Sequence, residues 1–61
     1  MRVMHVQACA VHLGDEMLVH DVGRSTVSVC HVSTLTLIGD DIEINGFFTT
    51  SRSNLVTVVA R

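Results

Sequence analysis

The chain has 61 residues, a formal charge of −2 and 48% hydrophobic residues, yet it contains no Trp and no Tyr. This length excludes more than one domain and leaves little room for a substrate cleft, and the negative charge gives no electrostatic reason to bind nucleic-acid phosphates or anionic membranes. A chain this short buries only about 60% of the surface that its unfolded form exposes, and chains of this size usually add a disulfide, a metal or a partner subunit. The generous apolar fraction therefore favours a homo-oligomer.

Short runs rich in β-branched residues alternate with turn signals along the whole chain. We expect strands over residues 3–11, 17–22, 25–32, 35–38, 42–44, 47–50 and 55–60. No segment keeps apolar residues at helical spacing for long enough to predict a helix, although a single helical or 3₁₀ turn over Ser51 to Asn54 stays open. Regular turn signals in an all-β chain predict a small barrel or a rolled antiparallel sheet of five to six short strands, built as one domain over residues 1–61.

The stretch from Val27 to Ile44 carries the clearest strand pattern. β-branched residues dominate both sides of the turn Gly39-Asp40-Asp41, and apolar and polar positions alternate, which predicts a hairpin buried on one face. Asn45-Gly46 predicts a two-residue type I′ turn, because both residues tolerate the positive φ that this turn requires. Earlier in the chain, Gly14 tolerates a positive φ, and the Asp15 carboxylate can accept hydrogen bonds from nearby backbone N–H groups.

The order of these features resembles a known family. An Ala/Val-rich opening leads to Leu13-Gly14-Asp15, a Gly turn at Gly23-Arg24, a long strand from Thr26 to Val32, a hairpin, and a terminal Leu55-Val56-Thr57-Val58-Val59. In this the chain is similar to the small SH3-like β-barrel proteins of actinobacterial bacteriophages and their hosts. The resemblance implies an SH3-like barrel, a phage or mobile-element origin, and a turn-stabilising role for Asp15. It assigns no functional residue, and Cys9 and His12 depart from the pattern of its first strand.

Histidine and cysteine form the best candidate set for chemistry, and its members are His5, Cys9, His12, His20, Cys30 and His31. Cys9-x-x-His12 and Cys30-His31 supply the N and S atoms that tetrahedral zinc requires. However, adjacent residues of a strand point to opposite faces, so Cys30 and His31 cannot both reach one ion unless the backbone bends. We therefore expect no metal site, with both cysteines as free thiols that act as small buried hydrophobes, and the histidines on solvated faces or at an interface.

Catalysis is not expected either. The same opposite-face argument excludes thiol catalysis by Cys30-His31, whereas a Cys9/His20 pair stays open. The acidic pairs Asp15-Glu16 and Asp40-Asp41 lack the alternating oxygen ligands of a calcium loop, and turn chemistry explains them. We assign no catalytic, cofactor-binding or metal-binding residue and expect no cofactor.

Nucleic-acid binding is the alternative function. Small barrels can bind single strands with stacking aromatics and a basic groove, and Phe47-Phe48 with Arg24 and Arg52 could supply both. Because neighbours in a strand face opposite ways, only one Phe can stack while the other packs inside, and the sequence leaves open which of the two is buried. With only four Arg and no Lys, the electrostatic contribution would be weak.

A non-enzymatic protein-interaction module is the function that we expect, acting as a homo-oligomer with a further protein partner of unknown identity. Apolar strands with free edges can pair with a partner's strand or with a copy of themselves. The run from Leu55 to Ala60 is apolar except for Thr57, which fits either such a pairing edge or a central strand of the sheet.

No membrane span or export signal is expected. No stretch approaches the roughly 18 continuous apolar residues that span a bilayer, and His5, Gln7 and His12 interrupt the apolar N-terminal stretch, which argues against a signal peptide. We therefore expect a cytoplasmic protein, in the host cytoplasm if a phage encodes it.

Overall fold

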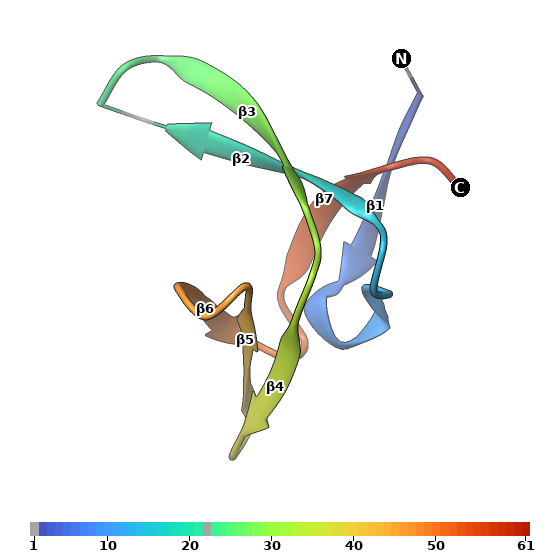
Figure 1. Cartoon of the computed structure of the whole chain (residues 1–61), viewed down its shortest axis with the longest axis vertical. Coiled ribbons are helices and arrows are strands. Elements are labelled where there is room, and N and C mark those ends of the chain that lie inside the picture. The colour runs from blue at the N-terminus through green and yellow to red at the C-terminus, as the bar shows by residue number, and fades with distance from the viewer. Residues whose placement is uncertain (1, 22) are drawn as a thin grey trace.

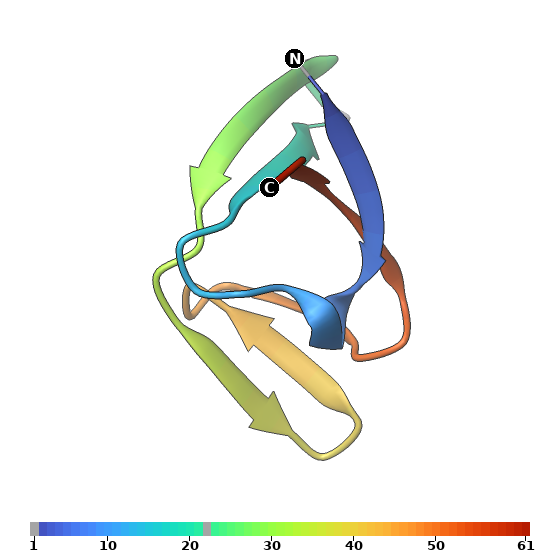
Figure 2. The same ribbon diagram turned by 90° about the vertical axis from the view of Figure 1, so that its right-hand side faces the viewer.

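Two antiparallel β-sheets make up the structure, a computed structural model that describes residues 2–21 and 23–61 (Figures 1 and 2). The elements in chain order are β1 (Val3–Gln7), the 3₁₀ turn η1 (Ala8–Ala10), β2 (Glu16–Asp21), β3 (Thr26–His31), β4 (Leu35–Ile38), β5 (Asp41–Ile44), β6 (Phe48–Ser51) and β7 (Leu55–Val59). The first sheet has the strand order β1-β7-β2-β3, and the second has the order β4-β5-β6. The all-β prediction is therefore confirmed, and the described residues contain no α-helix.

The two sheets do not form a closed barrel, and the seven strands correspond to the seven expected strand ranges but exceed the five to six of the predicted barrel or rolled sheet. The chain runs from β3 into β4 along one curved path (Figure 1), but Ser33 and Thr34 leave the first sheet before β4 begins the second. No ladder joins the two sheets. Of the two predicted architectures, the barrel was wrong, because local strand patterns do not reveal where a long curved strand changes its pairing partner.

Five buried residues form the core between the two sheets, namely Val11, Met17, Val32, Ile44 and Val58. They come from both sheets and from the loops beside β2 and β3, and the partly buried Met4, Val6, Val19, Leu35, Phe48 and Val56 pack around them. The alternation expected from the sequence is what places them on one side of each strand. The core is thus built from aliphatic side chains with one Phe at its margin.

The first strand ends earlier than its sequence suggests. β1 stops at Gln7, and η1 replaces the expected continuation to Val11. Long-range hydrogen bonds cause the change, because the backbone N–H of Ala8 donates to Asn54 O (2.8 Å) and that of Cys9 donates to Arg52 O (3.0 Å). Residues 51–54, for which a helical or 3₁₀ turn stayed open, form a turn closed by a hydrogen bond from Asn54 N to Ser51 O (3.0 Å) and contain no helix.

Asn45 and Gly46 have the positive φ angles that the sequence predicts, 59° and 78°. The turn spans three residues, however, because Ile44 pairs with Phe48 and leaves Phe47 in the loop. The Asn45 side chain also fixes the bend between β3 and β4. Its Oδ1 accepts from Ser33 N (2.7 Å), Ser33 Oγ (3.0 Å) and Thr34 N (3.3 Å), and its Nδ2 donates to His31 O (2.9 Å).

Replacing Asn45 with Ala is expected to lower the free energy of unfolding by about 2 kcal/mol, because it removes these hydrogen bonds and places a Cβ-bearing residue without a local partner at positive φ. Urea denaturation measures the loss. The matched control is Asn54→Ala, which removes one side-chain bond, from Nδ2 to Thr50 Oγ1 (2.9 Å), at a residue without a positive φ. Equal losses for the two variants would contradict the special role of Asn45.

Candidate interaction surface

The side of the first sheet that faces away from the core is the candidate functional surface. Strand pairing aligns its residues in three rows across β1, β7, β2 and β3. We call this surface the outer face, and it consists of Val3, His5, Gln7, Leu55, Thr57, Val59, Glu16, Leu18, His20, Val27, Val29 and His31. Their strand neighbours, such as Met17 and Val58, point into the core. The outer face is therefore a layer of twelve side chains, of which nine are exposed and Leu18, Thr57 and Val59 are half-buried.

The chemistry of the outer face is unusual for a solvated surface. Six of its side chains are aliphatic, and Val27 and Leu55 are 58% and 70% exposed. Glu16 is its only acidic residue, and it carries no Arg. Surfaces of this kind are more typical of contacts between proteins than of free solvent-facing sheets.

The second sheet presents a different surface to solvent. The side of β4, β5 and β6 that faces away from the core carries Thr36, Ile38, Asp41, Glu43, Thr49 and Ser51. Five of these six side chains are polar or acidic, as expected for a sheet face in contact with water. The outer face of the first sheet is thus the more apolar of the two solvent-facing sides.

A notch interrupts the outer face between β2 and β7. These strands pair only at Met17 with Val58 and at Leu18 with Thr57; beyond that point β2 pairs with β3 and β7 pairs with β1. A cavity of about 240 Å³ occupies the resulting gap, and we call it the β2–β7 notch. It is lined by Met17, Leu18, Val19, His20, Phe48, Leu55, Val56 and Thr57.

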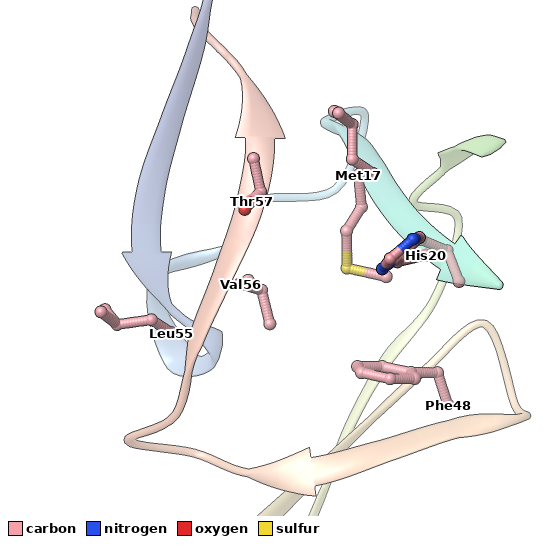
Figure 3. Close-up of a pocket in the computed structure, with 8 residues that line it drawn as sticks. Met17, His20, Phe48, Leu55, Val56 and Thr57 are labelled. Atoms are coloured by element: carbon pink, nitrogen blue, oxygen red, sulfur yellow. The ribbon is translucent and has the colours of Figure 1, made fainter. Parts of the chain in front are cut away.

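The lining of the β2–β7 notch includes both residues of the outer face and residues that belong to the core or pack against it. Met17, Val56 and Phe48 reach into the space between the strands, whereas Leu55 points away from it on the opposite side of β7 (Figure 3). Thr57 Oγ1 is already hydrogen-bonded to His5 Nδ1 at 2.9 Å. A volume of about 240 Å³ lies below the usual 300–1,000 Å³ of small-molecule sites. The notch therefore fits a large apolar side chain better than a cofactor.

No protein-family model, no curated protein and no solved structure gives a significant match to this chain. The function must therefore be inferred from the surface itself. Within residues 2–21 and 23–61, no helix is long and apolar enough to cross a membrane.

The histidines and cysteines do not gather at one point. His5, His20 and His31 belong to the outer face, Cys9 is exposed in η1, and Cys30 is a half-buried free thiol that faces the other way from His31. In the part of the chain that the structure describes, no three His, Cys, Asp or Glu residues lie close enough to share a metal ion. The expected burial of the cysteines was wrong for Cys9, because η1 turns its side chain to solvent.

Two open questions from the sequence are resolved. Phe48 is the phenylalanine that packs against the core, and Phe47 is 69% exposed. The run from Leu55 to Ala60 is not a pairing edge, because β7 lies between β1 and β2. The free edges of the two sheets belong to β1, β3, β4 and β6.

Among the residues that the structure describes, Asp15 is the one titratable side chain that is buried. Its Oδ2 accepts hydrogen bonds from Arg61 Nη2 (2.7 Å) and from the backbone N–H of His12 (2.9 Å), and its Oδ1 accepts from Arg61 Nε (3.0 Å). The Arg61 guanidinium is the main reason that the pKa of Asp15 falls from 3.8 to about 2, and the His12 N–H adds to this while burial opposes it.

Asp15 and Arg61 join the end of the chain to the loop before β2. Arg61 Nη2 also donates to Ala10 O (3.0 Å), and the backbone carbonyl of Asp15 accepts from Val32 N (2.8 Å). The carboxylate is thus enclosed by fixed donors, and Asp15 does not line the β2–β7 notch. The prediction that it accepts backbone hydrogen bonds is confirmed.

The outer face was not recognised from the sequence, although part of its signal is present there. Alternation alone groups Val27, Val29 and His31 on one side of a strand. That this side faces solvent follows only from the pairing of β3 with β2 and of β2 with β7. The core residues Met17 of β2 and Val58 of β7 point to the other side of the sheet. The notch has no local sequence signal.

Proposed function

We propose that this chain is a non-enzymatic protein-interaction module that self-associates through the outer face. The observation that carries the proposal is the contrast between the two sheets, one with six aliphatic side chains on its solvent side and the other with only Ile38 beside five polar or acidic ones. Burying exposed apolar surface contributes roughly 25 cal/mol per Å², and this drives most protein association.

A second copy of the chain is the partner that this surface fits best. Two outer faces bring together only one acidic side chain each, so packing them costs little in charge repulsion. Four strands about 4.8 Å apart and five residues long cover roughly 300 Å² in projection, which is small beside the ~800 Å² per partner of a standard interface. We therefore expect weak association, with a dissociation constant in the micromolar range or above.

The proposal includes the cellular location and the origin of the protein. Cys9 and Cys30 are free, and reduced thiols persist in the cytoplasm, where we place the chain. The resemblance to small SH3-like proteins of actinobacterial phages, carried by Leu13-Gly14-Asp15 and the terminal strand, supports a phage or mobile-element accessory protein that binds and does not catalyse. A further protein partner would compete for the same face.

Sedimentation velocity at increasing protein concentration tests self-association. We expect the sedimentation coefficient to rise with concentration between micromolar and millimolar, as for a weak reversible oligomer. A coefficient that stays at the monomer value over the whole range would contradict the proposal.

Binding of nucleic acid is the second candidate, favoured by the exposed ring of Phe47 in the turn between β5 and β6. Exposed aromatic rings can stack on bases of a single strand. The four Arg residues lie off the outer face, so this function would use a different surface. Retention on immobilised single-stranded nucleic acid at low salt, lost on Phe47→Ala, would support it; no retention at low salt would remove it.

A further inference from the structure

We propose that Asn45-Gly46 is a deamidation site that the fold protects, and that its reaction destroys the bend between the two sheets. The pair lies between β5 and β6, outside the outer face, and the reaction needs no second copy of the chain. Asn followed by Gly loses its side-chain amide more readily than other Asn-containing pairs, because no side chain hinders attack by the backbone nitrogen of Gly.

The reaction is an intramolecular displacement that consumes only water. Gly46 N attacks Asn45 Cγ and gives up its proton to solvent, the bond from Cγ to Nδ2 breaks, and ammonia leaves. Water then opens the resulting succinimide ring at either of its two carbonyl carbons. One opening gives Asp, and the other gives isoaspartate, in which the backbone runs through the former side chain and is longer by a methylene. In both products a carboxylate replaces the neutral amide.

Gly46, which supplies the attacking nitrogen, is open to solvent. It is exposed, and a Cβ placed on it would meet nothing within 4 Å apart from its chain neighbours. Solvent base can therefore reach its N–H, so the rate depends on whether Asn45 can bring its Cγ to this nitrogen.

The folded turn opposes formation of the ring. Phe47 N donates to Ile44 O (3.4 Å) and closes the turn, and the two residues inside it have φ angles of 59° and 78°. Positive φ at both of these residues is the type I′ pattern, in which the first has a ψ of about +30°. At that ψ the Cβ of Asn45 points away from Gly46 N, whereas the ring requires both on the same side of the Cα–C bond. The turn must therefore open before the ring can form.

The side-chain amide of Asn45 resists this opening. Its Oδ1 accepts from Ser33 N (2.7 Å), Ser33 Oγ (3.0 Å) and Thr34 N (3.3 Å), and its Nδ2 donates to His31 O (2.9 Å). Rotation of ψ moves this amide relative to β6, so it breaks either these four bonds or the pairing of β5 with β6. The reaction should therefore proceed only from the minor population in which the turn is open.

Both products lose the bend that Asn45 fixes. In Asp, the group that donated to His31 O becomes a carboxylate oxygen, which repels that carbonyl oxygen. In isoaspartate, the added methylene also displaces the side group from Ser33 and Thr34, the residues that join β3 to β4 and hence the first sheet to the second. A chain that opens often is thus marked by deamidation and folds less stably afterwards.

Peptide mass spectrometry of the full chain measures the rate at Asn45, after incubation at mildly alkaline pH either folded in buffer or unfolded in guanidinium chloride. We expect deamidation to be at least about tenfold slower in the folded chain, because the open turn is a minor state. Asn54, which precedes Leu55, is the internal control and should react slowly in both samples. A folded chain that reacts as fast as the unfolded one, or faster, would overturn the protection.

A variant that weakens the hydrogen bonds without altering the Asn-Gly pair tests their role. Ser33→Ala removes the hydroxyl bond to Asn45 Oδ1 and should raise the folded rate roughly fivefold while the unfolded rate stays unchanged. Ser53→Ala is the matched control, because it removes a hydroxyl contact with Ser51 (3.2 Å) at the end of β6 and should change neither rate. Equal folded rates for the two variants would contradict protection by these bonds.

The deamidated chain itself tests the loss of the bend. Its additional negative charge separates it from the unmodified chain by anion exchange. We expect its urea denaturation midpoint to lie below that of the unmodified chain. Equal midpoints would show that the bend survives the reaction and would overturn this part of the inference.

Discussion

Replacing Asp15 with Ala is expected to lower the free energy of unfolding by about 3 kcal/mol. The change removes three hydrogen bonds to a carboxylate that is only 8% exposed and leaves the Arg61 guanidinium without its partner. Breaking a buried ion pair from one side usually costs about 3–5 kcal/mol. Arg61 is 38% exposed, so water compensates part of its charge, and we place the loss at the lower end. For a 61-residue chain this is a large share of the total.

Urea denaturation at neutral pH measures this effect, with Asp21→Ala as the matched control. Asp21 also lies near an arginine, but its Oδ2 is 4.0 Å from Arg24 Nε and both side chains are more than half exposed. Exposed pairs contribute at most about 1 kcal/mol. If the two variants lost the same stability, the enclosed geometry of Asp15 would have no special importance.

The same carboxylate makes stability depend on pH. Because folding lowers the pKa of Asp15 from 3.8 to about 2, its contribution is fully present above pH 4 and is lost as the pH falls from about 4 to 2. The contribution is about 1–2 kcal/mol after allowance for the partial exposure of Arg61. The wild type should lose this stability across that interval, and Asp15→Asn should lose correspondingly less. Parallel pH profiles for the two proteins would contradict the assignment.

Replacing Val29 with Lys is expected to abolish self-association over the concentration range in which the wild type associates. Val29 lies on the outer face opposite Leu18 and is exposed, so the variant should fold normally. In the assembly it would place a positive charge from each copy in an apolar contact, where an unpaired charge is strongly unfavourable. We expect the dissociation constant to rise at least about a hundredfold.

The matched control for Val29→Lys is Thr36→Lys, a new charge on an exposed residue on the polar side of β4. It changes the net charge by the same amount and leaves the outer face intact. Sedimentation velocity should show wild-type association for this variant. Loss of association in both variants would mean that net charge, not the outer face, controls assembly.

Local sequence patterns predicted most of the strands but not their partners. The strand from Leu35 to Ile38 has the bounds expected of it, and the alternation around Gly39 gives the β4–β5 hairpin because its partners are close in sequence. Contacts between distant segments were missed. The first strand ends before Ala8, because the backbone N–H of Ala8 donates to the carbonyl oxygen of Asn54. No local sequence pattern reveals this contact.

The candidate surface depends on the same long-range contacts. The pattern of the terminal strand fits an edge or a centre equally well, and only its pairing with both β1 and β2 places Leu55 and Thr57 on the outer face. The bond between Asp15 and Arg61 joins residues 46 positions apart. Periodicity reports which side of a strand is apolar, but it does not report which side the core occupies when both carry aliphatic residues, as in β7.

Methyl ¹H–¹³C spectra of the full chain, recorded from low to high protein concentration, test the binding role of the outer face most directly. We expect the methyl signals of Val27, Val29 and Leu55 to shift progressively with concentration, while those of Leu37 and Ile38, which are also more than half exposed on the second sheet, stay in place. Shifts confined to Leu37 and Ile38, or no shifts at any concentration, would contradict self-association through the outer face.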